Sequence, residues 1–170
     1  MLPERRKNRL SEYDYSQNGA YFITICTQGR RQILWKSASA PVGASIARPQ
    51  QTPALSRTGE VVEACIIEIA ERYPHISVEK YVIMPNHIHL LLLVQREPGG
   101  RAMLAPTVST VMQQFKGAVS KRLGFTIWQK SFHDHVVRTE HGYAQIWQYI
   151  DTNPQNWHKD CFYEEPPHEP

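Results

Sequence analysis

The chain has 170 residues, a length that allows one domain with a buried core and requires no disulfide or metal for stability. Nineteen Lys and Arg against 16 Asp and Glu give a net charge of +3. The three cysteines are widely spaced, which excludes a disulfide framework and predicts a reduced, cytoplasmic protein. No apolar run is long enough to span a membrane, and the charged first ten residues are unlike a secretory signal.

The basic residues are unevenly distributed. Four of the first nine residues are Arg or Lys, whereas acidic residues gather after residue 159. Segregated positive charge is typical of a nucleic-acid partner, because phosphate contacts provide most sequence-independent affinity. A solvated surface explains the same pattern equally well. The candidate DNA-binding residues are Arg5, Arg6, Lys7, Lys116, Lys121, Arg122 and Arg138.

The first half of the chain begins with a predicted strand. Residues 20–27, AYFITICT, alternate between two sets of strong β formers. Residues 36–56 are rich in Ala, Ser and Pro and have no sustained period, which predicts a flexible insertion outside the compact core. An apolar stripe at helical spacing then predicts a helix over 58–73, which Pro74 ends.

The second half continues with two strands, ISVEKYVIM and HIHLLLLV, joined by the turn dipeptide Pro85-Asn86. A helix is predicted over 107–123, with Thr107 as its N-cap. A short strand over 131–138 and a helix over 140–152 follow, and a disordered tail is expected over 161–170.

The resulting order is β-α-β-β-α-β-α. It predicts one α+β domain spanning residues 1–170, with a ferredoxin-like split βαβ core, a central antiparallel sheet and an added C-terminal helix. This fold hosts unrelated functions, so the function must be inferred from a site.

Two histidines interrupt the most apolar segment, YVIMPNHIHLLLLV. Residues two apart in a strand point to the same face, so His87 and His89 project together while Ile88 and Leu90 face the helices. The pair fits part of a metal site, and two satisfied core histidines fit it as well. A second pair, His133 and His135, is less suited because its strand is short and its middle residue is charged.

The last predicted helix supplies further candidates. Tyr149 and Asn153 are four residues apart and therefore lie on one helix face. A tyrosine hydroxyl can attack a phosphodiester, and an asparagine amide oxygen suits Mg²⁺ or Mn²⁺. Taken singly, each residue also fits a structural role, Tyr149 in packing and Asn153 as a C-cap.

Several motifs together resemble a known family. MPNHIHLLL carries the histidine–hydrophobic–histidine (HUH) signature of single-tyrosine HUH transposases. WQKSFHDHVVRTEHGYAQIWQYIDTNP is similar to the REP-associated tyrosine transposase branch of that family, as are YDYSQNGAYFITICTQGRR and FKGAVSKR. The resemblance covers about 13–34 and 58–160, whereas residues 36–56 have no counterpart in it and His133 replaces an aromatic residue.

The resemblance implies a function and a set of roles. Tyr149 corresponds to the nucleophile, and His87, His89 and Asn153 to the ligands of Mg²⁺ or Mn²⁺. The implied activity is metal-dependent cleavage and strand transfer on single-stranded, hairpin-forming repeat DNA, through a 5′-phosphotyrosine intermediate. The site can be assembled within one chain or across a homodimer.

Three alternatives remain at this stage. The first is a non-catalytic ferredoxin-like module that binds single-stranded nucleic acid and merely packs its histidines. The second is a replication initiator or relaxase of the wider HUH group, which usually occurs in a longer chain. The third is a metal-dependent hydrolase in which the same ligands activate water and no protein-linked intermediate forms.

Overall fold

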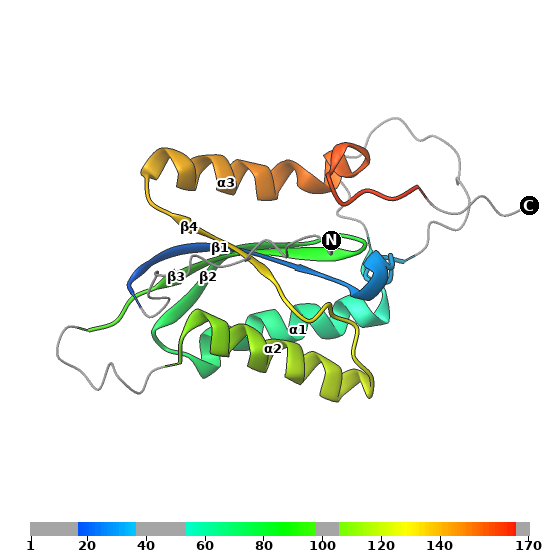
Figure 1. Cartoon of the computed structure of the whole chain (residues 1–170), viewed down its shortest axis with the longest axis horizontal. Coiled ribbons are helices and arrows are strands. Elements are labelled where there is room, and N and C mark those ends of the chain that lie inside the picture. The colour runs from blue at the N-terminus through cyan, green and yellow to red at the C-terminus, as the bar shows by residue number, and fades with distance from the viewer. Residues whose placement is uncertain (1–16, 37–53, 98–105, 166–170) are drawn as a thin grey trace, which may run out of the picture.

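The computed structural model describes residues 17–36, 54–97 and 106–165. Their order confirms the predicted succession of strands and helices, with two short 3₁₀ segments in addition (Figure 1). The elements are β1 (Gly19–Cys26), η1 (Gln28–Arg30), α1 (Arg57–Arg72), β2 (Ile76–Ile83), β3 (His87–Val94), α2 (Val108–Leu123), β4 (His133–Val137), α3 (Glu140–Thr152) and η3 (Asn153–Lys159). Among these residues no helix is both long enough and apolar enough to cross a membrane.

The four strands form one antiparallel sheet in the order β2-β3-β1-β4. Helices α1 and α2 cover one face of the sheet, and α3 lies across the other (Figure 1). The predicted α+β class and the added C-terminal helix are therefore confirmed. The two central strands, β1 and β3, are covered on both faces, which explains why β3 is apolar almost throughout.

Each long helix begins at a hydroxyl side chain that accepts a hydrogen bond from a backbone N–H of the first turn. Ser56 caps α1, Thr107 caps α2 and Thr139 caps α3. Helix α2 ends at Gly124, whose φ of 81° is the left-handed conformation that glycine adopts at low cost. These local signals place the helices where the sequence predicts them, within one residue.

Two apolar clusters hold the layers together. The larger lies between the sheet and the α1/α2 layer and contains Ile88, Leu90 and Leu92 of β3. The smaller lies between the sheet and α3, where Leu91 of β3 packs with Ile150. The alternation along β3 thus directs its aliphatic residues to both clusters and its two histidines to the α3 side.

The ends of the expected insertion lie beside each other. The Lys36 N–H donates to the carbonyl of Ala54 over 2.9 Å, and Trp35 and Leu55 form a β-bridge. Residues 54–56 therefore belong to the ordered structure and not to a flexible segment. Residues 37–53, where the rest of the predicted insertion falls, are outside the described residues.

The described chain also extends past the boundary expected at residue 161. The Asn86 side chain donates to the carbonyl of Phe162 over 2.8 Å, and Gln32 donates to that of Glu164 over 2.6 Å. The ring of Phe162 lies 4.7 Å from that of His87, centroid to centroid. Phe162 and Glu164 thus have defined partners, and residues 166–170 of the predicted tail lie outside the described residues.

Candidate functional site

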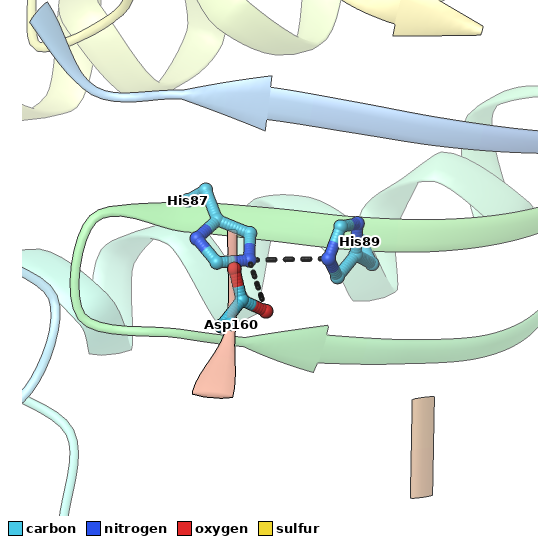
Figure 2. Close-up of side chains that lie close together, drawn as sticks. All are labelled: His87, His89 and Asp160. Carbon is cyan, nitrogen blue, oxygen red and sulfur yellow. Dashed lines mark hydrogen bonds and ion pairs between the residues drawn. The ribbon is translucent and has the colours of Figure 1, made fainter. Parts of the chain in front are cut away.

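His87 and His89 begin β3 directly after the turn that contains Pro85 and Asn86. Both imidazoles are buried, with 0% and 2% of their residue surface exposed. Their Nε2 atoms face each other at 3.1 Å, and Figure 2 shows the two rings on the same side of the strand. The sequence prediction that the two side chains project together is therefore confirmed.

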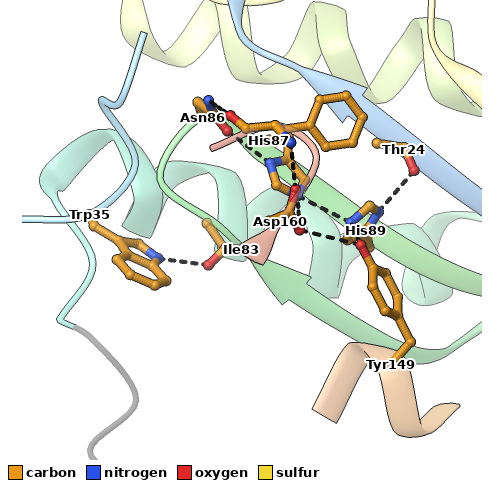
Figure 3. Close-up of polar contacts among 9 residues, drawn as sticks. Thr24, Trp35, Ile83, Asn86, His87, His89, Tyr149 and Asp160 are labelled. Carbon is orange, nitrogen blue, oxygen red and sulfur yellow. Dashed lines mark hydrogen bonds and ion pairs between the residues drawn. The ribbon is translucent and has the colours of Figure 1, made fainter. Parts of the chain in front are cut away.

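Each ring is held by a hydrogen bond on its other nitrogen (Figure 3). Nδ1 of His87 lies 2.8 Å from Oδ1 of Asn86, and Nδ1 of His89 lies 2.8 Å from Oγ1 of Thr24. Thr24 is the residue of β1 that pairs with His89 in the sheet register. Both Nε2 atoms consequently remain directed toward the space under α3.

The surroundings keep both rings neutral. Burial lowers the pKa of His87 to about 3, and the nearby positive charge of Arg30 acts in the same direction. Burial also lowers the pKa of His89 to about 3, with a further contribution from His87. A neutral imidazole offers a lone pair, which is the form that binds a metal.

Tyr149 approaches the histidines from α3. Its hydroxyl lies 3.3 Å from Nε2 of His89 and donates to Oδ2 of Asp160, also over 3.3 Å. The residue is 40% exposed, so a substrate can reach one side of it. Burial and the Asp160 carboxylate raise the pKa of Tyr149 to about 12, which keeps the phenol protonated at neutral pH.

Asp160 completes this cluster and was not predicted from the sequence. Its side chain is only 1% exposed, and Oδ2 lies 3.8 Å from Nε2 of His87 (Figure 2). Its other oxygen accepts the Phe162 N–H over 2.7 Å. Among the described residues, His87, His89 and Asp160 form the group whose ligand atoms all lie within 4.8 Å of one another.

This set of donors fits a small divalent cation. The two imidazoles are neutral, and their nitrogens lie within 4.8 Å of each other and of one oxygen of a buried carboxylate. Nitrogen and oxygen donors of this kind suit first-row divalent metals, and carboxylate also suits Mg²⁺.

Asn153, the predicted third ligand, lies at the end of α3. It is 3% exposed, and its backbone N–H donates to the carbonyl of Tyr149. Its Nδ2 atom is buried and makes no hydrogen bond within the described residues. The side chain nevertheless interacts with Tyr149, in the direction that lowers the pKa of the tyrosine, so it lies beside the phenol.

Lys80 of β2 contacts two residues of α3. Nζ of Lys80 lies 2.6 Å from a carboxylate oxygen of Asp151 and 4.1 Å from the ring centroid of Trp147. These two residues flank Tyr149 in the helix, so the contact fixes the helix on both sides of the tyrosine. Tyr149 and the histidines therefore meet within one chain.

The predicted DNA-binding residues do not gather at this cluster. Arg122 is bound to both carboxylate oxygens of Glu68, and Lys116 donates to the backbone carbonyls of Gln129 and Lys130. Both belong to α2, on the face of the sheet opposite α3, as does the exposed Lys121 (Figure 1).

The remaining predicted contacts are Arg138 and the N-terminal cluster. Arg138 is exposed and follows β4 directly. Arg5, Arg6 and Lys7 lie outside the described residues.

Comparisons with known proteins can now be set beside this geometry. No protein-family model matches the chain. An uncharacterized protein of Haemophilus influenzae is 29% identical over 181 residues, covering 95% of this chain and 94% of that protein. The solved structure of a REP-associated tyrosine transposase bound to a REP hairpin superposes with a TM-score of 0.61 at 22% identity, over 87% of this chain and 74% of that one. The two share a fold. The resemblance found in the sequence motifs is thus matched by the architecture.

Proposed function

We propose that this protein is a transposase-like enzyme of the REP-associated tyrosine type, which cuts and rejoins single-stranded DNA. The observation that supports this best is the convergence of the Tyr149 hydroxyl, two neutral imidazoles and a buried carboxylate within hydrogen-bonding or near-contact distance. The shared fold and the motifs around His87 and Tyr149 support the same assignment.

In the proposed reaction, the oxygen of Tyr149 forms a bond to the scissile phosphorus and the bond to the 3′-oxygen breaks. The products are a 5′-phosphotyrosine and a free 3′-OH, and attack by a second 3′-OH reverses the step and joins strands. Oδ2 of Asp160 accepts the tyrosine hydroxyl hydrogen in the structure, so it is the group placed to take the proton. A divalent cation held by His87 and His89 would withdraw charge from the phosphate.

The further ligands of the cation are drawn from two residues. Asn153 is the ligand that the sequence resemblance implies, and its buried side chain lies beside Tyr149, where the amide oxygen would be the donor atom. Asp160 is the alternative ligand, because its Oδ2 faces His87; if this oxygen binds the cation, it is not the group that takes the proton of Tyr149. We propose Mg²⁺ or Mn²⁺, the ions that the sequence resemblance implies, because the carboxylate and amide oxygens at the site suit both.

The proposed substrate is a single strand that forms a hairpin. A REP hairpin is bound to the solved transposase whose fold this chain shares. On this chain, the exposed Arg138, which directly precedes the N-cap of α3, is the candidate phosphate contact, whereas Lys121 lies on the opposite face of the sheet. Because Tyr149 meets His89 in one chain, we propose that one chain suffices for cleavage even if two associate.

The test is covalent trapping. End-labelled hairpin single strands are incubated with the protein and Mn²⁺, and adducts are separated on a denaturing gel. We expect an adduct that requires Mn²⁺ and is absent from Tyr149→Phe, while Tyr143→Phe serves as the matched control from the same helix.

An adduct that survives in Tyr149→Phe would show that another residue is the nucleophile. Cleavage without any adduct would indicate a metal-dependent hydrolase. Tight hairpin binding with neither cleavage nor metal dependence would indicate a binding module.

A further inference from the structure

The second histidine pair, His133 and His135, has a place in the fold that the proposed reaction leaves unused. Both residues belong to β4, an edge strand of the sheet, and both are exposed. The sheet register pairs His133 with Thr24 and His135 with Phe22, two residues of β1. Directly paired residues of an antiparallel sheet point to the same face. The two imidazoles therefore lie on the face that carries Thr24 and Phe22.

The same face carries the candidate site. Oγ1 of Thr24 lies 2.8 Å from Nδ1 of His89. The ring of Phe22 is stacked on the ring of His89, with 5.0 Å between their centroids, and meets the ring of Tyr149 edge-on at 6.1 Å. Neighbouring strands are roughly 5 Å apart, so the exposed imidazoles of β4 stand one strand beyond Phe22 and about 10 Å from β3.

Helix α3 leaves β4 open on this face, because the helix packs mainly on β2 and β3 (Figure 1). Near the start of α3, a Cβ added to Gly142 would lie 3.9 Å from Cγ1 of Val137, so this side of the helix is turned toward β4. Tyr149 follows seven residues later, which is close to two helical turns, and thus projects from the same side. It is 40% exposed, and the strand that carries the exposed imidazoles lies on this side of it.

Aromatic rings thus lead from the reacting group to the edge of the sheet. Phe22 contacts Tyr149 on one side and pairs with His135 on the other. Exposed rings on a four-stranded sheet are a common platform for unpaired bases, because every base has a π face and histidine is among the side chains on which bases stack. The exposed Arg138 directly follows β4, where it can contact a phosphate of a strand that lies on these rings.

We propose that His133 and His135 form a stacking platform for bases of the single-stranded substrate, next to the phosphate that Tyr149 attacks. On this path the strand runs from Tyr149 over Phe22 to the outer edge of the sheet, with its bases on β4 and a phosphate at Arg138. No bond forms or breaks at the two histidines, so they position the substrate and are not catalytic. The inference rests on the proposed function, because it assumes a single strand at Tyr149.

The wild-type protein provides the first test, with two fluorescent strands that separate the bases from the phosphates. One is oligo(dT) of about 12 nucleotides, and the other has the same length and phosphates but an abasic sugar at every position. Affinities are measured by fluorescence anisotropy in chelator, so that metal-dependent cleavage does not interfere. We expect oligo(dT) to bind more tightly by about tenfold or more, the effect of stacking one or two bases. Equal affinities for the two strands would overturn the inference.

Two double variants provide the second test. His133→Ala with His135→Ala removes both rings, whereas His133→Phe with His135→Phe keeps a flat ring at each position. We expect the alanine pair to bind oligo(dT) about tenfold or more weakly and the abasic strand as wild type does. We expect the phenylalanine pair to bind oligo(dT) within a few-fold of wild type. Phe125→Ala is the matched control, because it removes an exposed ring beyond the end of α2, the helix on the other face of the sheet.

Two results would overturn the platform. An alanine pair that binds oligo(dT) as tightly as wild type would show that the two rings contact no base. An alanine pair that loses the same factor on oligo(dT) and on the abasic strand would show that the imidazoles contact phosphates only. Both positions are exposed, so these changes leave the buried core intact.

Covalent trapping on a hairpin strand separates this inference from the function on which it rests. If wild type forms the Mn²⁺-dependent adduct but the alanine pair binds oligo(dT) unchanged, the proposed function stands and the platform is overturned. If wild type forms no adduct but the affinities follow the expected pattern, the proposed chemistry fails and the base-binding surface stands. In the alanine pair we expect adduct formation to recover at saturating DNA, and a loss that persists at saturation would contradict a positioning role.

Discussion

Burial of His87 and His89 as neutral rings makes the stability of the cation-free protein depend on pH. Burial lowers the pKa of each ring from 6.5 to about 3. Between these values the unfolded histidines bind protons that the folded ones do not. Unfolding therefore takes up protons in this range, and the free energy of unfolding falls as the pH falls.

The magnitude follows from proton linkage. Each histidine changes the free energy of unfolding by up to about 1.4 kcal/mol per pH unit in this range. Integrated from pH 6.5 to pH 5, the loss is roughly 3 kcal/mol for the two rings together. The range from pH 6.5 to pH 5 lies well above the pKa values of the folded protein, so the loss of free energy depends mainly on the histidine pKa in the unfolded chain. Carboxylates titrate mainly below this range and contribute little.

The assay is urea denaturation in chelator at pH values from 7 to 5, followed by tryptophan fluorescence. We expect the dependence on pH to be about halved in His89→Gln. His133→Gln provides the matched control, because His133 is an exposed histidine of β4 that is not part of the buried pair. A free energy of unfolding that stays constant between pH 6.5 and pH 5 would refute the burial of two neutral imidazoles.

Three further predictions concern the helix that carries Tyr149 and the charges around it. Lys80→Met should lower the free energy of unfolding by roughly 1–2 kcal/mol, because the lysine holds α3 through Asp151 and Trp147. It should also reduce the rate of DNA cleavage more than the affinity for DNA. Equal losses in rate and affinity would contradict this role. Asp160→Asn should bring the pKa of Tyr149 down from about 12, since it removes the negative charge beside the phenol, and ultraviolet titration in chelator measures it. Arg138→Gln should weaken hairpin binding and reduce its salt dependence by about one counterion, whereas Arg122→Gln should change binding little because Glu68 already holds that guanidinium.

Much of the fold was predictable because its signals are local. Apolar periodicity, hydroxyl caps and Pro74 define the helices, and the alternation of β3 places His87 and His89 on one face. The spacing of residues in the last helix likewise put Tyr149 and Asn153 on one helix face, whereas only the family resemblance implied that this face meets the histidines. These features depend on residues within one or two turns of each other, so they can be inferred from one sequence.

Asp160 could not be predicted in this way. In the sequence it stands among the acidic residues that precede the C-terminus, where a solvated tail is the ordinary interpretation. Its position depends on η3, which turns the chain after Pro154, and on contacts of Phe162 with His87 and Asn86. An available signal was the aromatic pair of residues at the start of the expected tail, Phe162 and Tyr163, because disordered segments contain few aromatic residues.

The hydrogen bonds of Thr24 and Asn86 also lay beyond the sequence. Thr24 was one of several β formers in a strand, and Asn86 was half of a turn dipeptide. Their roles arise from the register between β1 and β3 and from the segment that returns to His87, which no local pattern encodes.

The pairing of Lys36 with Ala54 has a practical consequence for work on this protein. The two ends of the 17-residue segment between Lys36 and Ala54 are therefore hydrogen-bonded to each other. They lie next to Trp35, whose indole N–H donates to the carbonyl of Ile83. The entropy of closing a loop changes only slowly with its length. A linker of a different length between Lys36 and Ala54 should therefore close on the same hydrogen-bonded ends at little cost in stability.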